Sequence, residues 1–338
     1  MKQQTFFKAV LCCSLMVMII LSAQVKAQPS QSRRGGLYGD WQVKINYGGG
    51  QFDSILSFSR DREGKQTGSW ISLMGLSELK DIKYEEGQLS FSRDSRNREG
   101  ETTTSNFKGT IKDGILTGTW SSDRGEYKME GKRSPRVPRA VGSWVIKYKF
   151  GEREITSTLV VEADKEGNLT AQWQGRRSKS EITELQYERG NLSFKRKSTY
   201  QDSQRESAFE GTVRGDTLSG VMKSERGEIA VEGKLIGGPV IGTWNLEIAS
   251  ERGSSKQRLM VNADMSGLYG ANPIKKVNLE GDQVSFKIVL EYGERKFEIS
   301  FKGKLEDSKL TGELTSSRGS QKVKGTKVIR TYRRRSTN

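Results

Sequence analysis

Residues 39–45 read Gly-Asp-Trp-Gln-Val-Lys-Ile, in which a glycine and a tryptophan lead into an alternation of apolar and polar side chains. Alternation with a period of two is typical of a β-strand with one buried and one solvated face. The Gly-x-Trp opening returns at Gly142-Ser143-Trp144 and again at Gly242-Thr243-Trp244. A signal that recurs at such spacing predicts tandem copies of one structural unit.

Other short motifs follow each Gly-x-Trp signal in the same order. A Leu-Ser-Phe or Val-Ser-Phe triplet ends at Phe91, Phe194 and Phe286. A Phe-x-Gly triplet begins at Phe107, Phe209 and Phe301, and an Arg-Gly pair begins at Arg124, Arg226 and Arg318. We therefore predict three β units, covering residues 38–133, 141–235 and 241–331.

Each unit is long enough for about eight short strands, and its turns are rich in glycine and aspartate. In the first unit the predicted strands are 40–47, 52–60, 66–73, 78–84, 88–94, 103–112, 115–121 and 126–132. Short turns make consecutive strands antiparallel neighbours, and a meander of this size can remove its exposed edges by closing. The predicted fold is all-β, with three tandem eight-stranded antiparallel meander β-barrels. The alternative is a β-sandwich in each repeat, and hydrogen bonding between first and last strands distinguishes the two.

The N-terminal 27 residues have the layout of an export signal. Lys2 and Lys8 precede an apolar stretch at 9–21, and Val25-Lys26-Ala27 supplies a cleavage site. Such a segment is removed on export, so we predict a secreted or periplasmic protein. Later apolar runs are too short to cross a bilayer, which predicts no transmembrane segment.

Composition narrows the chemistry further. The chain has no histidine, and its two cysteines, Cys12 and Cys13, lie within the predicted signal. Zinc sites built on these residues and imidazole catalysis are therefore excluded, and we predict no cofactor and no metal. The formal net charge is +16, with arginines concentrated in the linkers and in a basic tail at 332–338. A cell-surface or extracellular polyanion is a more fitting partner than a specific nucleic acid.

The Gly-x-Trp signals and the segment Gly167-Asn168-Leu169-Thr170-Ala171-Gln172-Trp173 resemble the opening of avidin-like and lipocalin-like barrels. The whole unit also resembles a repeat of secreted bacterial proteins of unassigned activity. The resemblance implies a barrel, a binding module and tryptophans that plug one barrel end, here Trp41, Trp144 and Trp244. The lipocalin C-terminal helix and a biotin-binding residue set have no counterpart, so biotin is not carried over.

The first unit is the best candidate for a ligand site. It alone carries three tryptophans on its predicted inward face, whereas the second has Met222 in place of Trp120. The candidate ligand-binding residues are Trp70, Trp120, Phe58, Phe91 and Phe107. Because this set is apolar, the expected ligand is small and hydrophobic, and it requires space between the tryptophans.

The recurrent Arg124, Arg226 and Arg318 have two interpretations. The residue before them changes from Asp to Glu to Ser, which favours a turn whose glycine is the required residue. The alternative is a shared contact to an anion or a partner at the barrel rim.

Three functions remain open at this stage. The leading hypothesis is an exported non-catalytic binding module that carries a small apolar ligand in the first barrel. The first alternative is a structural or adhesive surface protein with solid barrels. The second is a carboxylate-dependent hydrolase, although no Asp or Glu recurs on an inward position of all three units.

Overall fold

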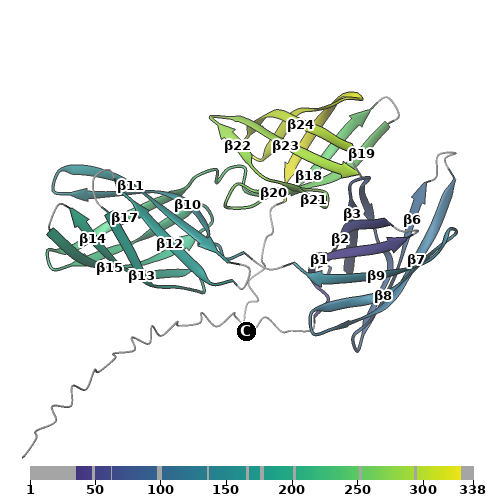
Figure 1. The fold of residues 1–338 in the computed structure, drawn as a ribbon, viewed down its shortest axis with the longest axis horizontal. Coiled ribbons are helices and arrows are strands. Elements are labelled where there is room, and N and C mark those ends of the chain that lie inside the picture. Colours follow the sequence, from purple (N-terminus) through teal and green to yellow (C-terminus); the bar gives the residue numbers. More distant parts are fainter. Residues whose placement is uncertain are drawn as a thin grey trace, which may run out of the picture.

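A computed structural model describes residues 36–328, except 48–49, 62, 97–100, 135–136, 165–166, 176–178, 201–202, 251–252 and 293–294. Within that part of the chain every regular element is a β-strand, and the strands form three separate antiparallel sheets in meander order. Each sheet curls into a nearly closed barrel (Figure 1). The all-β prediction is confirmed. The predicted signal and the basic tail lie outside the described residues.

Barrel 1 contains nine strands. They are β1 (Gly39–Tyr47), β2 (Gly50–Arg60), β3 (Gln66–Ser72), β4 (Gly75–Glu78), β5 (Lys80–Glu85), β6 (Gln88–Arg96), β7 (Thr102–Lys112), β8 (Ile115–Ser122) and β9 (Gly125–Arg133). The first strand pairs with the last, and Trp41 lies opposite Arg133. This pairing identifies a barrel and not a sandwich.

Barrel 2 contains eight strands. They are β10 (Gly142–Phe150), β11 (Arg153–Ala163), β12 (Leu169–Gln174), β13 (Lys179–Glu188), β14 (Asn191–Tyr200), β15 (Ser203–Arg214), β16 (Thr217–Ser224) and β17 (Gly227–Leu235). Again the first and last strands pair, with Trp144 opposite Leu235.

Barrel 3 contains nine strands. They are β18 (Gly242–Ser250), β19 (Gly253–Val261), β20 (Gly267–Tyr269), β21 (Asn272–Ile274), β22 (Val277–Glu280), β23 (Gln283–Tyr292), β24 (Arg295–Glu306), β25 (Lys309–Ser316) and β26 (Gly319–Lys327). Trp244 lies opposite Lys327 where β18 meets β26.

In each sheet two strands that follow one another in the chain are not hydrogen-bonded to each other, and they form the two edges of the sheet. We call the interruption between these edges the seam of the barrel. The seams lie between β4 and β5, between β12 and β13, and between β21 and β22. In barrel 1 the predicted fourth strand 78–84 is broken at Leu79, so that β4 pairs with β3 while β5 pairs with β6. A shift of register between Lys80 and Lys83, with Asp81 at φ 51°, accompanies the break. The prediction of eight strands was therefore one short in this barrel.

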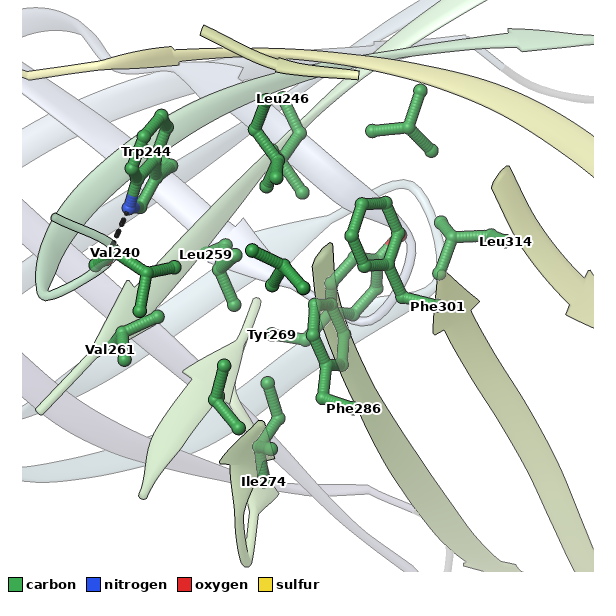
Figure 2. Packing of buried hydrophobic residues seen from close by; sticks show 14 of the residues in the cluster. Val240, Trp244, Leu246, Leu259, Val261, Tyr269, Ile274, Phe286, Phe301 and Leu314 are labelled. Atoms are coloured by element: carbon green, nitrogen blue, oxygen red, sulfur yellow. Dashed lines mark hydrogen bonds between the residues drawn. The ribbon is translucent and has the colours of Figure 1, made fainter. Parts of the chain in front are cut away.

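Every barrel has its own hydrophobic core, made by the inward positions of its strands. In Figure 2 the core of barrel 3 runs from Trp244 at one end, past Leu246 and Leu259, to Phe286 and Phe301. We call the end closed by the Gly-x-Trp tryptophan the proximal end. The opposite, distal end carries the turns that follow β1, β3 and β8 in barrel 1.

Barrel 3 lies against barrel 1, next to the short hairpin of β20 and β21 (Figure 1). Arg258 on β19 is buried there, with Nη2 placed 3.1 Å from Oδ2 of Asp40 on β1. The Gln257 side chain donates a hydrogen bond of 2.8 Å to the Ser72 carbonyl at the end of β3. The first and third repeats are therefore packed together, although they are separated in sequence by the second.

Candidate functional site

The Gly-x-Trp tryptophans occupy equivalent places at the proximal ends. Each is fully buried, and each indole N–H donates a hydrogen bond to the carbonyl four residues earlier: Leu37 (2.8 Å), Ala140 (2.9 Å) and Val240 (2.7 Å). This satisfied donor is typical of a structural tryptophan. The structure places Trp41, Trp144 and Trp244 in the cores of their barrels.

A cation covers two of these three rings. Arg133 lies 5.1 Å from the Trp41 centroid, and Lys327 lies 5.5 Å from that of Trp244. In barrel 2 the corresponding place opposite Trp144 is taken by Leu235. Cation–π contacts therefore differ between the repeats.

The five candidate ligand-binding residues of barrel 1 come together in one aromatic cluster. The ring centroids of Trp70 and Trp120 are 4.7 Å apart, and Phe91 stacks on Phe107 at 4.9 Å. Phe58 lies 6.0 Å from Phe91. The two tryptophans contact each other, so there is no space between them. A ligand at this cluster has to lie on its distal side.

The Phe-x-Gly motif accounts for part of this close packing. Gly109 and Gly118 are paired across β7 and β8, and the Phe107 ring lies over the pair. A Cβ at Gly118 would come within 2.6 Å of the Phe107 ring carbon Cζ. Phe209 and Phe301 lie over equivalent glycine pairs in the other barrels. These inward glycines make room for a phenylalanine and not for a ligand.

A polar residue that the sequence analysis overlooked lies beside the tryptophans. Arg93 follows Leu89 and Phe91 on the inward positions of β6, and its guanidinium carbon is 4.8 Å from the Trp70 centroid. Arg93 Nε donates a hydrogen bond of 2.8 Å to Ser77 Oγ on β4. The candidate residues named from the sequence are all apolar, and Arg93 adds a charged group beside them. The same two-residue period that identified Phe91 includes Arg93, so the signal was present in the sequence.

Two buried polar groups near this end of barrel 1 have no hydrogen-bond partner. They are the indole Nε1 of Trp70, a residue 1% exposed, and Oγ of Ser54, a residue 2% exposed. Ser105, also buried, lies directly opposite Arg93 on β7. An unsatisfied buried donor costs on the order of 1–3 kcal/mol. Such groups are more costly without a ligand than with one that supplies a matching atom.

The electrostatics of Arg93 follow from its burial. Burial lowers the pKa of Arg93 below its usual range, because a desolvated guanidinium loses the hydration of its charge. Among the described residues the structure records no ion pair for this side chain, whose recorded contacts are Ser77 and Trp70. A half-buried cation thus lies over an aromatic ring without a carboxylate.

Barrel 2 repeats part of this arrangement. The Arg196 guanidinium is 4.6 Å from the Trp173 centroid, and Nε donates a hydrogen bond of 3.1 Å to Ser180. Burial lowers the pKa of Arg196, and the electrostatic effect of Tyr148 offsets part of that lowering. In barrel 1 the position of Tyr148 is held by Ile45. The arginine of barrel 2 therefore has a phenol near it that Arg93 lacks.

The recurrent arginines at the rims are exposed and belong to tight turns. In each turn the arginine N–H donates a hydrogen bond to the serine hydroxyl two residues earlier, at 3.2 Å for Arg124, 3.3 Å for Arg226 and 3.2 Å for Arg318. The following glycines have φ between 109° and 123°. The backbone conformation alone explains the repeated Arg-Gly turn, and the arginine side chains remain candidates for a rim contact.

The described residues offer little support for catalysis by buried carboxylates or for a metal site. No Asp or Glu belongs to the buried polar residues there, and no cluster of three or more His, Cys, Asp or Glu side chains is arranged to hold a metal. Within the same ranges, no helical segment has the length and apolarity that a membrane span requires.

Comparisons with known proteins add little to this picture. No protein-family model matches the chain, and no curated protein matches it significantly. A proposed outer membrane protein from Bacteroides fragilis is 11% identical, covering 86% of this chain and 97% of its own, with a TM-score of 0.23. A protein of unknown function from Nostoc punctiforme is 10% identical, with 86% and 96% covered and a TM-score of 0.20. Transferrin-binding protein B from Haemophilus parasuis is 10% identical, with 85% and 67% covered and a TM-score of 0.18. At these TM-scores the likenesses carry no argument about function.

Proposed function

We propose that the protein is an exported, non-catalytic binding protein whose first barrel holds a small ligand at its distal end. The ligand would lie on the outer side of Trp70 and Trp120. The observation that carries this proposal is the pair of buried groups without partners, Trp70 Nε1 and Ser54 Oγ, beside an aromatic surface. Ligand sites usually combine an apolar lining with a few convergent polar groups. Barrel 1 has both features near its distal end.

A structural or adhesive surface protein is the alternative function. It is favoured by the direct contact of Trp70 with Trp120, which leaves the space between them filled by the protein itself. In that function binding would use the exposed rims, where Arg124, Arg226 and Arg318 lie, together with the predicted basic tail. Such binding would weaken steeply with salt.

The test is native mass spectrometry of the mature chain purified from the organism that encodes it. We expect a stoichiometric small molecule that is released on unfolding. The Trp120→Met variant gives barrel 1 the residue that barrel 2 has in Met222, so the core should tolerate it. At the other tryptophan, Trp70→Phe keeps an aromatic ring and removes the N–H that has no partner. Both variants should lose most of the ligand.

The matched control is Trp173→Phe in barrel 2, which should leave the ligand bound. A wild-type protein of bare chain mass that also binds no small apolar molecule added to it would contradict a ligand in barrel 1. Retention of the ligand in both barrel 1 variants would place it elsewhere. Either result would favour the alternative function, in which the exposed rims of the barrels bind a partner.

A further inference from the structure

We infer that the distal end of barrel 1 recognises an organic anion, with Arg93 binding the negative group and Trp70 and Trp120 contacting the apolar body. This inference rests on the proposed function and names the chemical class of its ligand. The argument starts from the position of the guanidinium, which lies over the Trp70 ring and is held through Nε by Ser77.

The geometry leaves the binding end of Arg93 available. A guanidinium has five N–H donors in a planar fork, and the recorded hydrogen bond of Arg93 uses the one on Nε. The terminal nitrogens are the ones that bind a carboxylate, sulfonate or phosphate in a bidentate manner. Ser77 and Trp70 hold the fork in one orientation, which reduces the entropy lost on binding.

The charge balance also favours an anion. A half-buried guanidinium without a carboxylate is costly, because burial removes solvation and no Coulombic attraction replaces it. Among the described residues of barrel 1, ion pairs join Lys80 to Asp94 and Asp40 to Arg258, and no recorded pair involves Arg93. An anionic ligand would supply the missing partner.

The surroundings favour an anion attached to an apolar body over a bare inorganic ion. Trp70 lies under Arg93 and contacts Trp120, and both aromatic side chains are buried. Ser105 lies opposite Arg93, and Ser54 carries a buried hydroxyl without a partner. Hydroxyls of this kind can donate to further ligand oxygens.

The other barrels supply the contrast that makes the inference specific. In barrel 2 Tyr148 lies beside Trp173, the ring under Arg196, and Met222 replaces the second tryptophan. In barrel 3 the position of Arg93 is held by Ile288, and that of Trp70 by Tyr269. We therefore expect one anion site in the chain, in barrel 1.

The experiment compares two fluorescent probes of nearly the same shape on the full mature chain. 8-Anilinonaphthalene-1-sulfonate carries a sulfonate, and N-phenyl-1-naphthylamine lacks it. We expect one sulfonate probe per chain, bound at least about tenfold more tightly than the neutral one, as one charge-assisted contact provides. Arg93→Gln should remove this preference and leave the neutral probe bound.

Two further variants and a competitor complete the design. Arg196→Gln is the matched control in barrel 2 and should leave both probes unaffected. Ile45→Tyr places a phenol where barrel 2 has Tyr148. It should weaken the binding of the sulfonate probe while the charge of Arg93 is kept. Inorganic phosphate at equal concentration should not displace the probe. Circular dichroism and thermal unfolding check that each variant is folded.

The outcomes separate this inference from the proposed function. Equal binding of both probes, unchanged by Arg93→Gln and Ile45→Tyr, would overturn the anion site and leave an apolar ligand in barrel 1. If Arg196→Gln loses the preference for the sulfonate probe to the same extent as Arg93→Gln, the assignment of the site to barrel 1 is contradicted. Displacement of the sulfonate probe by phosphate would contradict the need for an apolar body in the ligand. Binding of neither probe would count against the proposed function as well.

Discussion

At the scale of single residues, the phenylalanine of each Phe-x-Gly motif explains two glycines that would otherwise weaken the strands. Phe107 lies over Gly109 and over Gly118, which faces it from β8. Glycine in a strand costs packing and backbone entropy, so its recurrence requires a reason such as this close approach.

Substituting Gly118 by alanine tests that explanation. The new Cβ would overlap the Phe107 ring and the Lys108 carbonyl oxygen. We expect Gly118→Ala to lower the free energy of unfolding by about 1–3 kcal/mol, the usual effect of overpacking. Gly36→Ala is the control, because a Cβ there meets nothing within 4 Å, and it should stay within about 0.5 kcal/mol. Urea denaturation measures both.

Tyr269 makes the stability depend on alkaline pH. Burial raises the pKa of its phenol above the usual value of 10.0, because the phenolate would be desolvated. Above pH 10 the unfolded chain loses this proton while the folded chain keeps it. The contribution is thus complete below pH 10 and falls by about 1.4 kcal/mol per pH unit above it. Tyr269→Phe should remove this part of the slope in urea titrations between pH 9 and 11, and an unchanged slope would contradict it.

At the scale of elements, the barrels are closed by the pairing of first and last strands and open at a seam between two others. The bulge at Asp81 interrupts the regular pairing of β5 with β6, and the break at Leu79 separates β4 from β5. Arg93 on β6 reaches Ser77 on β4, so its side chain spans the seam of barrel 1. The element that carries the proposed anion contact is therefore also part of the barrel closure.

Hydrogen exchange should detect the seams. Backbone amides in edge strands have fewer ladder partners, so local opening there costs less free energy than in central strands. We expect amides of β4 and β22 to exchange at least about tenfold faster than those of β1 and β18, which pair on both sides. Mass spectrometry of peptic fragments measures the rates. Equal protection of these strands would mean that the seams are closed in solution.

At the scale of the whole molecule, the third repeat differs from the others where it meets the first. Its third strand is reduced to β20, which pairs with β19 at residues 259–261 alone. The β3–β4 turn of barrel 1 lies along the rest of that edge, where Gln257 bonds the Ser72 carbonyl. An exposed strand edge is a site for unwanted pairing, and covering it removes that hazard.

The buried pair of Asp40 and Arg258 should control this packing. Arg258 has 7% of its side chain exposed and Asp40 20%, and Ser57 also donates to Asp40. We expect Arg258→Ala to weaken the contact by about 3 kcal/mol, since it leaves a poorly solvated carboxylate. Barrels 1 and 3 should then unfold in separate calorimetric transitions. Lys287→Ala removes an exposed pair with Glu298 and should change little. A single unshifted transition in Arg258→Ala would show that this pair does not hold the barrels together.

Much of the architecture followed from local patterns. The repeated Gly-x-Trp signal, the period of two and the short turns predicted three antiparallel barrels, because these features depend on neighbours close in the chain. The inward positions of Trp70, Trp120 and Phe91 were also predicted, from the alternation of inward and outward residues along the strands. Arg93 was missed because an arginine is ordinarily assigned to the solvated face, even where its position matches the inward period.

The amino-acid sequence by itself determined the strand pattern, the repeat and the residues that face inward, since alternation and turn chemistry are local properties. The tertiary structure alone decided that Trp70 contacts Trp120, that Arg93 lies over Trp70, and that barrel 3 packs on barrel 1 through Arg258 and Asp40. Those contacts join residues far apart in the chain. Their geometry depends on how strands curl and how barrels pack, which no local pattern specifies.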